Sequence, residues 1–331
     1  MQALVTGGSG FIGSELIRQL NAKNIKVRAL LRKTSPRGNL QGLDFETALG
    51  DLCDAASLKE VVKGIDVVFH VAGSISARSR EEFFLHNATG TGNLAKACAE
   101  ANPGLKRFVY VSSVAATGPA LSLSPKRESD TALPISAYGE SKLGGEKQLE
   151  AFAGIFPVTV VRPPAVYGPR DRGIFEFVKL VNSGVAPIFP AKNETREKYF
   201  SMIYVEDLVD GILLAGLAES QKRYEVFFLS DGQVHSWTQV MKTMADALGK
   251  RPLRLPLPRF VWLSIAAAYS VAGKVLKKQF PLTLDKLNEL DPDYWIFSSD
   301  HAQSVLGFKP KWDLQRGMAH TVAWYRENGW V

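Results

Sequence analysis

The chain has 331 residues, of which 46% are hydrophobic and 22% are charged, as in a soluble globular enzyme with one large domain or two unequal lobes. Cys53 and Cys98 have no metal-type spacing and the five histidines are scattered, so we expect neither a disulfide scaffold nor a metal site. The net charge is +7, yet the basic residues form no long block, so we expect no nucleic-acid partner.

Short β-branched runs alternate with helical stretches through the first half of the chain. The predicted strands are 3–5, 27–31, 67–71, 107–112 and 158–161, and the predicted helices are 13–21, 56–62, 93–101 and 138–153. The strands are continuous apolar runs, which fit a sheet buried on both faces. We therefore predict an α/β fold with a Rossmann-type, doubly wound parallel sheet.

Glycines follow the first predicted strand with the spacing Gly-x-x-Gly-x-x-Gly and lead directly into the first helix. The first allows a tight turn, the second lets the backbone approach a pyrophosphate, and the third lets helix and strand pack closely. The phosphates would meet free N–H groups at the positive end of the helix. We predict NAD(P) contacts in this loop by Gly7, Gly10, Phe11, Ile12 and Gly13.

The end of the second predicted strand discriminates between the two cofactors. An acidic residue there holds the ribose 2′-hydroxyl of NAD, but this chain has Arg32 at that place. A guanidinium can pair with the 2′-phosphate of NADP. We therefore expect NADP(H) rather than NAD(H).

The second half of the chain is less regular and richer in clustered prolines. Residues 201–217 predict one more strand and helix of the first lobe, and 314–328 predict a closing helix. We expect an NAD(P)-binding Rossmann domain of residues 1–165 plus about 201–229. A smaller α+β substrate-binding lobe would comprise residues 166–200 and 230–331. Because a strand begins at once, we expect no signal peptide and a cytoplasmic protein, with membrane association left open.

Several further segments follow the glycine loop in a familiar order. They are Gly50-Asp51-Leu52, Val71-Ala72-Gly73, Asn87 with Gly90-Thr91, Val111-Ser112-Ser113, Tyr138-Gly139-Glu140-Ser141-Lys142, Arg162 to Pro169, Tyr204 to Asp207 and Leu306 to Pro310. With this order the chain resembles the extended short-chain dehydrogenases/reductases, also called NAD-dependent epimerases/dehydratases, over nearly its whole length. Within this family, the sequence most resembles dihydroflavonol reductase-like and 3β-hydroxysteroid dehydrogenase-like members.

The resemblance implies a catalytic triad of Ser113, Tyr138 and Lys142. Ser113 would polarise a substrate carbonyl and Tyr138 would exchange the proton. Tyr138 and Lys142 stand at i and i+4 of one predicted helix, so we expect the ammonium to lower the pKa of the phenol. The resemblance further implies cofactor-site roles for Asp51, Leu52, Val71, Ala72, Asn87, Ser112, Pro163 and Val166.

Departures from the family pattern narrow the range of substrates that we expect. Val114-Ala115-Ala116 stands where the sugar dehydratases have an Asp-Glu pair, and Phe200 stands where nucleotide-sugar enzymes often have a diphosphate-binding Arg. No Arg occurs from 260 to 315. We therefore predict an oxidoreductase that interconverts an apolar ketone and a secondary alcohol. A nucleotide-sugar epimerase and a non-catalytic NADP-sensing regulator are the alternatives.

Residues 260–273 are apolar on every face of a helix but too short to span a bilayer. Three interpretations stay open: a buried core helix, the lining of an apolar substrate pocket, and peripheral membrane contact through residues 259–278. A homodimer is expected from the resemblance alone.

Overall fold

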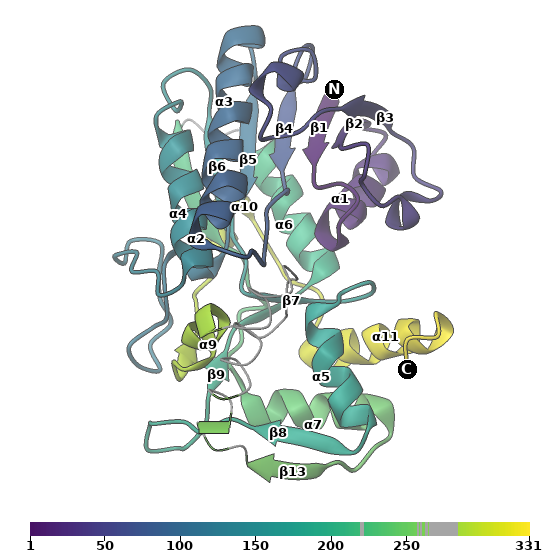
Figure 1. The fold of residues 1–331 in the computed structure, drawn as a ribbon, viewed down its shortest axis with the longest axis vertical. Coiled ribbons are helices and arrows are strands. Elements are labelled where there is room, and N and C mark those ends of the chain that lie inside the picture. The colour runs from purple at the N-terminus through teal and green to yellow at the C-terminus, as the bar shows by residue number, and fades with distance from the viewer. Residues whose placement is uncertain (219–221, 257, 259, 262–263, 265–283) are drawn as a thin grey trace.

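The computed structural model describes residues 1–331 apart from 219–221, 257, 259, 262–263 and 265–283. It has a large lobe built on a parallel sheet and a smaller lobe below it (Figure 1). Most of the apolar segment 260–273 lies outside the described residues. Among the helices that are described, none combines the length and the apolar character needed to cross a bilayer.

Seven strands form the large sheet in the order β11-β6-β5-β4-β1-β2-β3, and every pairing is parallel. The strands are β1 (Gln2–Thr6), β2 (Lys26–Leu31), β3 (Glu46–Leu49), β4 (Val67–His70), β5 (Arg107–Val111), β6 (Val158–Arg162) and β11 (Tyr224–Phe228). The five predicted strands of the first half are present within one or two residues. This sheet confirms the predicted Rossmann-type fold.

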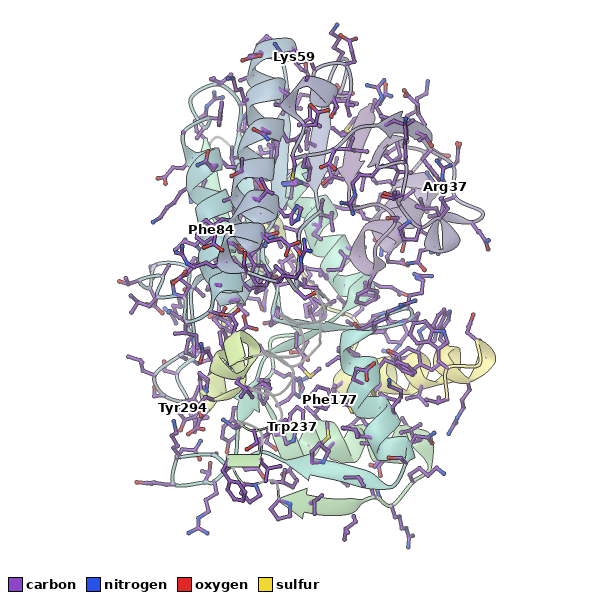
Figure 2. The ribbon with its side chains drawn as sticks, viewed as in Figure 1. Arg37, Lys59, Phe84, Phe177, Trp237 and Tyr294 are labelled. Atoms are coloured by element: carbon purple, nitrogen blue, oxygen red, sulfur yellow. The ribbon has the colours of Figure 1, made fainter. Side chains whose placement is uncertain are left out.

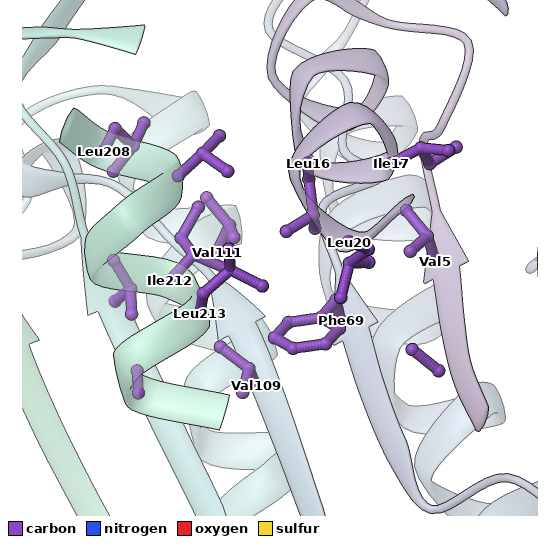
Figure 3. Packing of buried hydrophobic residues seen from close by; sticks show 14 of the residues in the cluster. Val5, Leu16, Ile17, Leu20, Phe69, Val109, Val111, Leu208, Ile212 and Leu213 are labelled. Atoms are coloured by element: carbon purple, nitrogen blue, oxygen red, sulfur yellow. The ribbon is translucent and has the colours of Figure 1, made fainter. Parts of the chain in front are cut away.

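Helices cover both faces of this sheet and bury its apolar strands. One face carries α1 (Phe11–Ala22), α6 (Val205–Leu217) and α10 (Asp300–Leu306), and the other carries α3 (Gly90–Ala101) and α4 (Ala137–Glu150). Figure 3 shows the first face, where Leu16, Leu20, Ile212 and Leu213 of two helices pack over Phe69. Each such buried side chain contributes roughly 1.5–3 kcal/mol of transfer free energy.

The predicted helix 56–62 is wrong. Only a short 3₁₀ turn, Ala55–Leu58, forms there. The hydroxyl of Ser57 donates to the carbonyls of Asp51 and Asp54 (3.2 and 2.7 Å), and the Asp54 side chain caps Ala56. These local side-chain bonds offer the backbone an alternative to the helix.

The sequence analysis also missed one strand and misplaced another. The edge strand β3 was missed because its four residues do not form the continuous apolar run of a buried strand. Three of the four are exposed. The strand expected within 201–217 is β10 (Met202–Tyr204), which pairs with β7 (Ala165–Tyr167) outside the large sheet. The seventh strand of the large sheet is β11 instead, placed beside β6. The boundaries of the two predicted domains stay a prediction.

The small lobe has its own core of aromatic and aliphatic side chains. Its helices are α5 (Gly173–Asn182), α7 (Trp237–Leu248), α9 (Leu284–Leu290) and α11 (Leu314–Glu327), and its strands are β8 (Val185–Ile188), β9 (Tyr199–Phe200), β12 (His235–Ser236), β13 (Leu253–Pro256) and β14 (Tyr294–Trp295). The short helix α2 (Arg80–Phe84) instead packs on α4 of the large lobe. Phe177 and Trp237 meet edge-to-face with ring centroids 5.1 Å apart (Figure 2). The closing helix predicted at 314–328 is α11.

Asp207 joins the two lobes from the first turn of α6. Its buried carboxylate accepts the backbone N–H groups of Lys311 (3.0 Å) and Trp312 (2.9 Å), just before α11. The neighbouring Asp210 makes only an exposed ion pair with Lys311. The two acids therefore differ in burial although they lie one turn apart.

We expect Asp207→Ala to lower the free energy of unfolding by at least about 2 kcal/mol, because two buried N–H groups lose their acceptor. The matched Asp210→Ala change should cost no more than about 1 kcal/mol, as exposed ion pairs do. Equilibrium urea unfolding of both variants measures the difference. Equal losses would show that the carboxylate of Asp207 does not support the junction.

Candidate active site

The predicted site residues gather at one edge of the large sheet, where its strands end. Because the strands are parallel, their carboxyl ends meet at this edge. The glycine loop leaves β1 there, and the residues after β4, β5 and β6 lie beside it. In open α/β sheets ligands bind outside these strand ends.

The glycine loop leaves no room for side chains. Gly7 has a φ of +71°, and a Cβ added to it would stand 2.7 Å from the backbone nitrogen of Ala72. A Cβ on Gly13 would collide with the carbonyl of Gly7. The N–H of Gly10 donates to the Gly7 carbonyl (2.9 Å), and Gly10 is the residue before helix α1. The backbone is thus open to a phosphate at the helix N-terminus, so the loop fits a dinucleotide.

Arg32 is exposed and directly follows β2, the strand that pairs with β1 just before the glycine loop. Its backbone N–H donates to Ser35 Oγ (2.9 Å), which turns the chain and leaves the guanidinium in solvent. Asn39, which the sequence analysis missed, donates from Nδ2 to the carbonyl of Ser9 (3.1 Å). The hydrogen bond from Asn39 to Ser9 fixes the Arg32 loop against the glycine loop. Arg37, in the same loop, lies at the outer edge of the large lobe (Figure 2).

The loop after β3 carries the residues expected at the adenine. Asp51 donates its N–H to Ser57 Oγ (3.0 Å) and accepts the N–H of Cys53 (2.9 Å) on its carboxylate. The carbonyl of Leu52 accepts from Asn93 of α3 (2.8 Å). Hydrogen bonds therefore hold both residues in place at the sheet edge.

A buried histidine supports the strand ends from below. The His70 ring lies between Thr6 Oγ1 (2.7 Å) and Thr91 Oγ1 (2.8 Å), and Thr6 Oγ1 in turn accepts the N–H of Ala72 (3.1 Å). Complete burial lowers the pKa of His70 to about 3, so the ring stays neutral near pH 7. This chain of bonds sets the backbone of Val71 and Ala72, which are predicted to line the nicotinamide ribose.

Asn87 braces the backbone on the other side of the site. It lies in a π-helical turn, Leu85–Thr89, of the kind that is frequent at functional sites. Its amide accepts the N–H of Ser74 (2.7 Å) and donates to the Ser74 carbonyl and to Ser141 Oγ (2.9 Å each). It thereby ties the loop after β4 to helix α4.

Ser113 and Tyr138 come together, although 25 positions separate them. Ser113 follows β5, and its Oγ accepts the N–H of Ala115 (3.1 Å). Tyr138 lies at the start of α4, its ring contacts Phe83 (5.9 Å between centroids), and its phenol lies near enough to Ser113 for the serine to affect its pKa. Burial and the nearby Glu289 raise the pKa of Tyr138, and Ser113 lowers it only in part.

The expectation that Lys142 lowers the pKa of Tyr138 is wrong for this structure. Lys142 Nζ donates to the carbonyl of Val111 (2.7 Å) and lies 4.3 Å from the Tyr110 ring centroid. Burial lowers the pKa of the ammonium to about 7, and Glu146 opposes this shift. Desolvation thus weakens the charge that would stabilise a tyrosinate, and it raises the pKa of the phenol as well.

A buried ion pair behind the triad escaped the sequence analysis. Glu146 lies one turn after Lys142 and binds Arg162 through two oxygens (3.0 and 2.6 Å). Ser112, predicted as a cofactor contact, donates its hydroxyl to Glu146 (2.5 Å). The four-residue spacing between Lys142 and Glu146 on one predicted helix could have indicated that the two side chains lie on the same helix face. This pair joins α4 to β5 and β6 under the site.

The remaining predicted contacts lie after β6. The carbonyl of Pro163 accepts the N–H of Val114 (3.1 Å), which places it next to the loop that follows Ser113. Val166 pairs with Ile203 in the β7–β10 sheet and is half-buried. Both residues therefore belong to the segment that leads from the large sheet to the small lobe.

Two acidic residues of α9 contact the start of α4. Asp285 accepts the N–H of Ala137 (2.8 Å), and Glu289 accepts the hydroxyl of Ser136 (2.7 Å). Phe200, the position expected to carry Arg in nucleotide-sugar enzymes, packs its ring against Trp237 (5.7 Å). The two side chains of α9 that bond to the start of α4 are therefore both acidic.

Fold and site geometry agree with what the chain is similar to. Residues 3–228 match the model of the NAD dependent epimerase/dehydratase family, so the chain belongs to that family. It is an NAD(P)-dependent enzyme of the short-chain dehydrogenase/reductase type that acts on CH–OH groups.

Individual relatives span reductases and epimerases. The chain is 31% identical to a ceramide reductase of Caulobacter vibrioides, with 99% of this chain and 95% of the relative covered. It is 30% identical to a UDP-glucose 4-epimerase of Vibrio cholerae, with 96% and 94% covered. The crystal structure of gox2253 superposes with a TM-score of 0.80 at 27% identity and covers 99% of both chains.

Relatives of the two expected subgroups are also present. A putative dihydroflavonol 4-reductase of Synechocystis sp. is 29% identical, with 99% of this chain and 95% of the relative covered. A sterol-4-alpha-carboxylate 3-dehydrogenase of Schizosaccharomyces pombe is 29% identical, with 98% and 97% covered. The predicted resemblance is thereby confirmed.

The buried His70 predicts a pH dependence of stability. Below pH 6.5 the unfolded chain takes up a proton that folded His70 refuses down to about pH 3, so the folded state loses stability as the pH falls. The stability gap between wild type and His70→Gln should shrink by about 1.4 kcal/mol from pH 7.5 to 5.5. Urea unfolding at both pH values measures the gap. A constant gap would mean that folded His70 takes up a proton.

Proposed function

We propose that the protein is an NADP(H)-dependent oxidoreductase that interconverts an apolar ketone and a secondary alcohol. The observation that carries the proposal is the proximity of Ser113, after β5, to the buried Tyr138, flanked by the carboxylates of Asp285 and Glu289. The two hydroxyls can share one carbonyl oxygen. Carboxylates beside them disfavour a negatively charged diphosphate and tolerate an uncharged substrate.

The apolar character of the substrate has independent support. Phe200 occupies the place where a phosphate-binding Arg is expected, and it belongs to an aromatic cluster with Trp237. A relative at 31% identity is named a ceramide reductase. A bulky, poorly charged carbonyl compound is the substrate class that fits both.

The chain's own residues would divide the chemistry as follows. When bound, the nicotinamide supplies or accepts the hydride. Ser113 Oγ and Tyr138 Oη donate hydrogen bonds to the carbonyl oxygen, and in reduction Tyr138 gives its proton to that oxygen. Lys142 would bind the nicotinamide ribose from its buried place beside the carbonyl of Val111. Asn87 and the Glu146–Arg162 pair hold α4 in register.

An epimerase is the second candidate, because the Vibrio cholerae relative is 30% identical over nearly the whole chain. Epimerases retain their cofactor through the reaction cycle. Tightly bound NAD in the purified protein, together with turnover of a nucleotide sugar, would favour this candidate. Free exchange of NADPH and turnover of an apolar ketone would favour the reductase.

Tyr138→Phe should lower kcat for an apolar ketone at least about 100-fold, because the proton donor is lost while the ring still contacts Phe83. NADPH affinity should stay within about threefold. Steady-state rates and NADPH fluorescence titration measure the two effects. The matched Tyr224→Phe change, in β11, should leave kcat unchanged. Full activity of Tyr138→Phe would contradict the proposed mechanism, and absence of turnover in the wild type would favour a cofactor-sensing regulator.

Wild-type protein should bind NADPH at least about tenfold tighter than NADH, which corresponds to about 1.4 kcal/mol. Arg32→Asp should remove that preference because the 2′-phosphate loses its guanidinium partner and meets a carboxylate. Lys33→Asp makes the same charge change one residue later and should keep most of the preference. Equal binding of both cofactors by wild-type protein would contradict the assignment of Arg32.

A further inference from the structure

The excess positive charge of the chain is confined to one segment. Between residues 247 and 284 there is no Asp or Glu, while seven Lys and Arg occur: Lys250, Arg251, Arg254, Arg259, Lys274, Lys277 and Lys278. The rest of the chain carries 33 Lys and Arg against 33 Asp and Glu. The whole net charge of +7 therefore comes from this stretch, and the remainder is balanced. A charge asymmetry of this kind marks an anionic partner.

Residues 249–256, in the first part of this segment, lie on the surface at the end of the small lobe. Strand β13 pairs in parallel with β8 and stands beside α7. We name the surface the β13 face and define it by exposed side chains of α7, β13 and the turn between them. These are Lys242, Lys250, Arg251, Leu253, Arg254 and Leu255.

The β13 face contains a pocket of about 210 Å³ with cationic walls. Lys242, Lys250, Arg251 and Arg254 line it, and Asp246 is the one acidic residue among its lining side chains. Four cations against one carboxylate leave an excess of three positive charges around a small concave site. Arg and Lys in such a cluster suit the phosphate of a headgroup.

Large apolar side chains are also exposed on β13 and shortly after it. Leu253 is 70% exposed and Leu255 is 40% exposed, and the two point to the side of β13 opposite Arg254, because side chains alternate along a strand. Among the described strands β13 pairs with β8 on one edge only, so a planar surface that approaches its free edge can reach side chains of both sides. Phe260, four residues after the strand, is 69% exposed. Exposed apolar groups interleaved with Lys and Arg are the composition of surfaces that bind the membrane interface.

We propose that the β13 face docks on the surface of a lipid bilayer that contains anionic lipids. Its cations would pair with headgroup phosphates, and Leu253, Leu255 and Phe260 would enter the headgroup layer. Duplex nucleic acid offers the same phosphates but no apolar layer, so these three side chains would gain nothing there. The inference does not rest on the proposed reaction.

The position of the β13 face in the molecule allows such docking. Strands β8 and β13 lie at the end of the small lobe that is farthest from the large sheet (Figure 1). The glycine loop and Arg32 belong to the opposite lobe. A bilayer at the β13 face therefore leaves the cofactor site accessible from solution.

The test is co-sedimentation of the full chain with vesicles of phosphatidylcholine alone and with vesicles that also contain 30% (about one lipid in three) phosphatidylglycerol. We expect binding to the anionic vesicles that is at least about tenfold tighter and is lost in high salt. Arg251→Glu with Arg254→Glu should weaken it at least about tenfold. The matched pair Lys23→Glu with Lys96→Glu, two exposed cations of the large lobe, should leave it unchanged.

A second variant tests the apolar contribution. Leu253→Asn with Leu255→Asn keeps every charge and should weaken binding at least about threefold, and thermal melts check that each variant folds. No binding to anionic vesicles, or an equal loss in the Lys23/Lys96 control, would overturn the proposal. Tighter binding to a 20-base-pair (roughly two-turn) duplex than to vesicles would overturn it in favour of nucleic acid.

Discussion

The parallel arrangement of the large sheet is the constraint on which the site depends. All seven strands point the same way, so their carboxyl ends form one edge, and every connection must return over a face of the sheet. The glycine loop, the ribose segment after β4, Ser113 after β5 and Pro163 after β6 therefore meet at that edge although 150 residues separate them. Helix α4 adds Tyr138 and Lys142 because its first turns lie against the loop after β5.

Burial of ionisable groups shapes the chemistry of this edge. Desolvation raises the pKa of Tyr138 and lowers the pKa of Lys142 to about 7, so each group is pushed toward its neutral form. The Glu146–Arg162 pair lies immediately behind them and is stable only because each charge satisfies the other. A proton donor is thus kept protonated near neutral pH, and a carbonyl oxygen that enters the site meets two hydroxyl donors.

Charge is unevenly distributed over the small lobe, and the two sides have different consequences. Acidic residues of α9 contact the start of α4, and under the proposed function they would disfavour a diphosphate substrate. Basic residues of the β13 face lie at the other end. Under these proposals, the α9 side of the small lobe would face an uncharged substrate and the β13 face would contact an anionic membrane. The cofactor site lies in the other lobe.

From the sequence alone, the parallel α/β architecture, the glycine loop and Arg32 at the end of β2 could be predicted, because each depends on local periodicity or short spacing. The candidates Ser113, Tyr138 and Lys142 came from the family resemblance. It could not predict β3, the β7–β10 pairing or the loss of the helix at 56–62, since those follow from side-chain hydrogen bonds and from neighbours distant in the chain. The contact of α9 with α4, the Glu146–Arg162 pair and the raised pKa of Tyr138 were decided only by the tertiary structure. Each arises from groups that folding brings together and removes from water, and no local pattern records that desolvation.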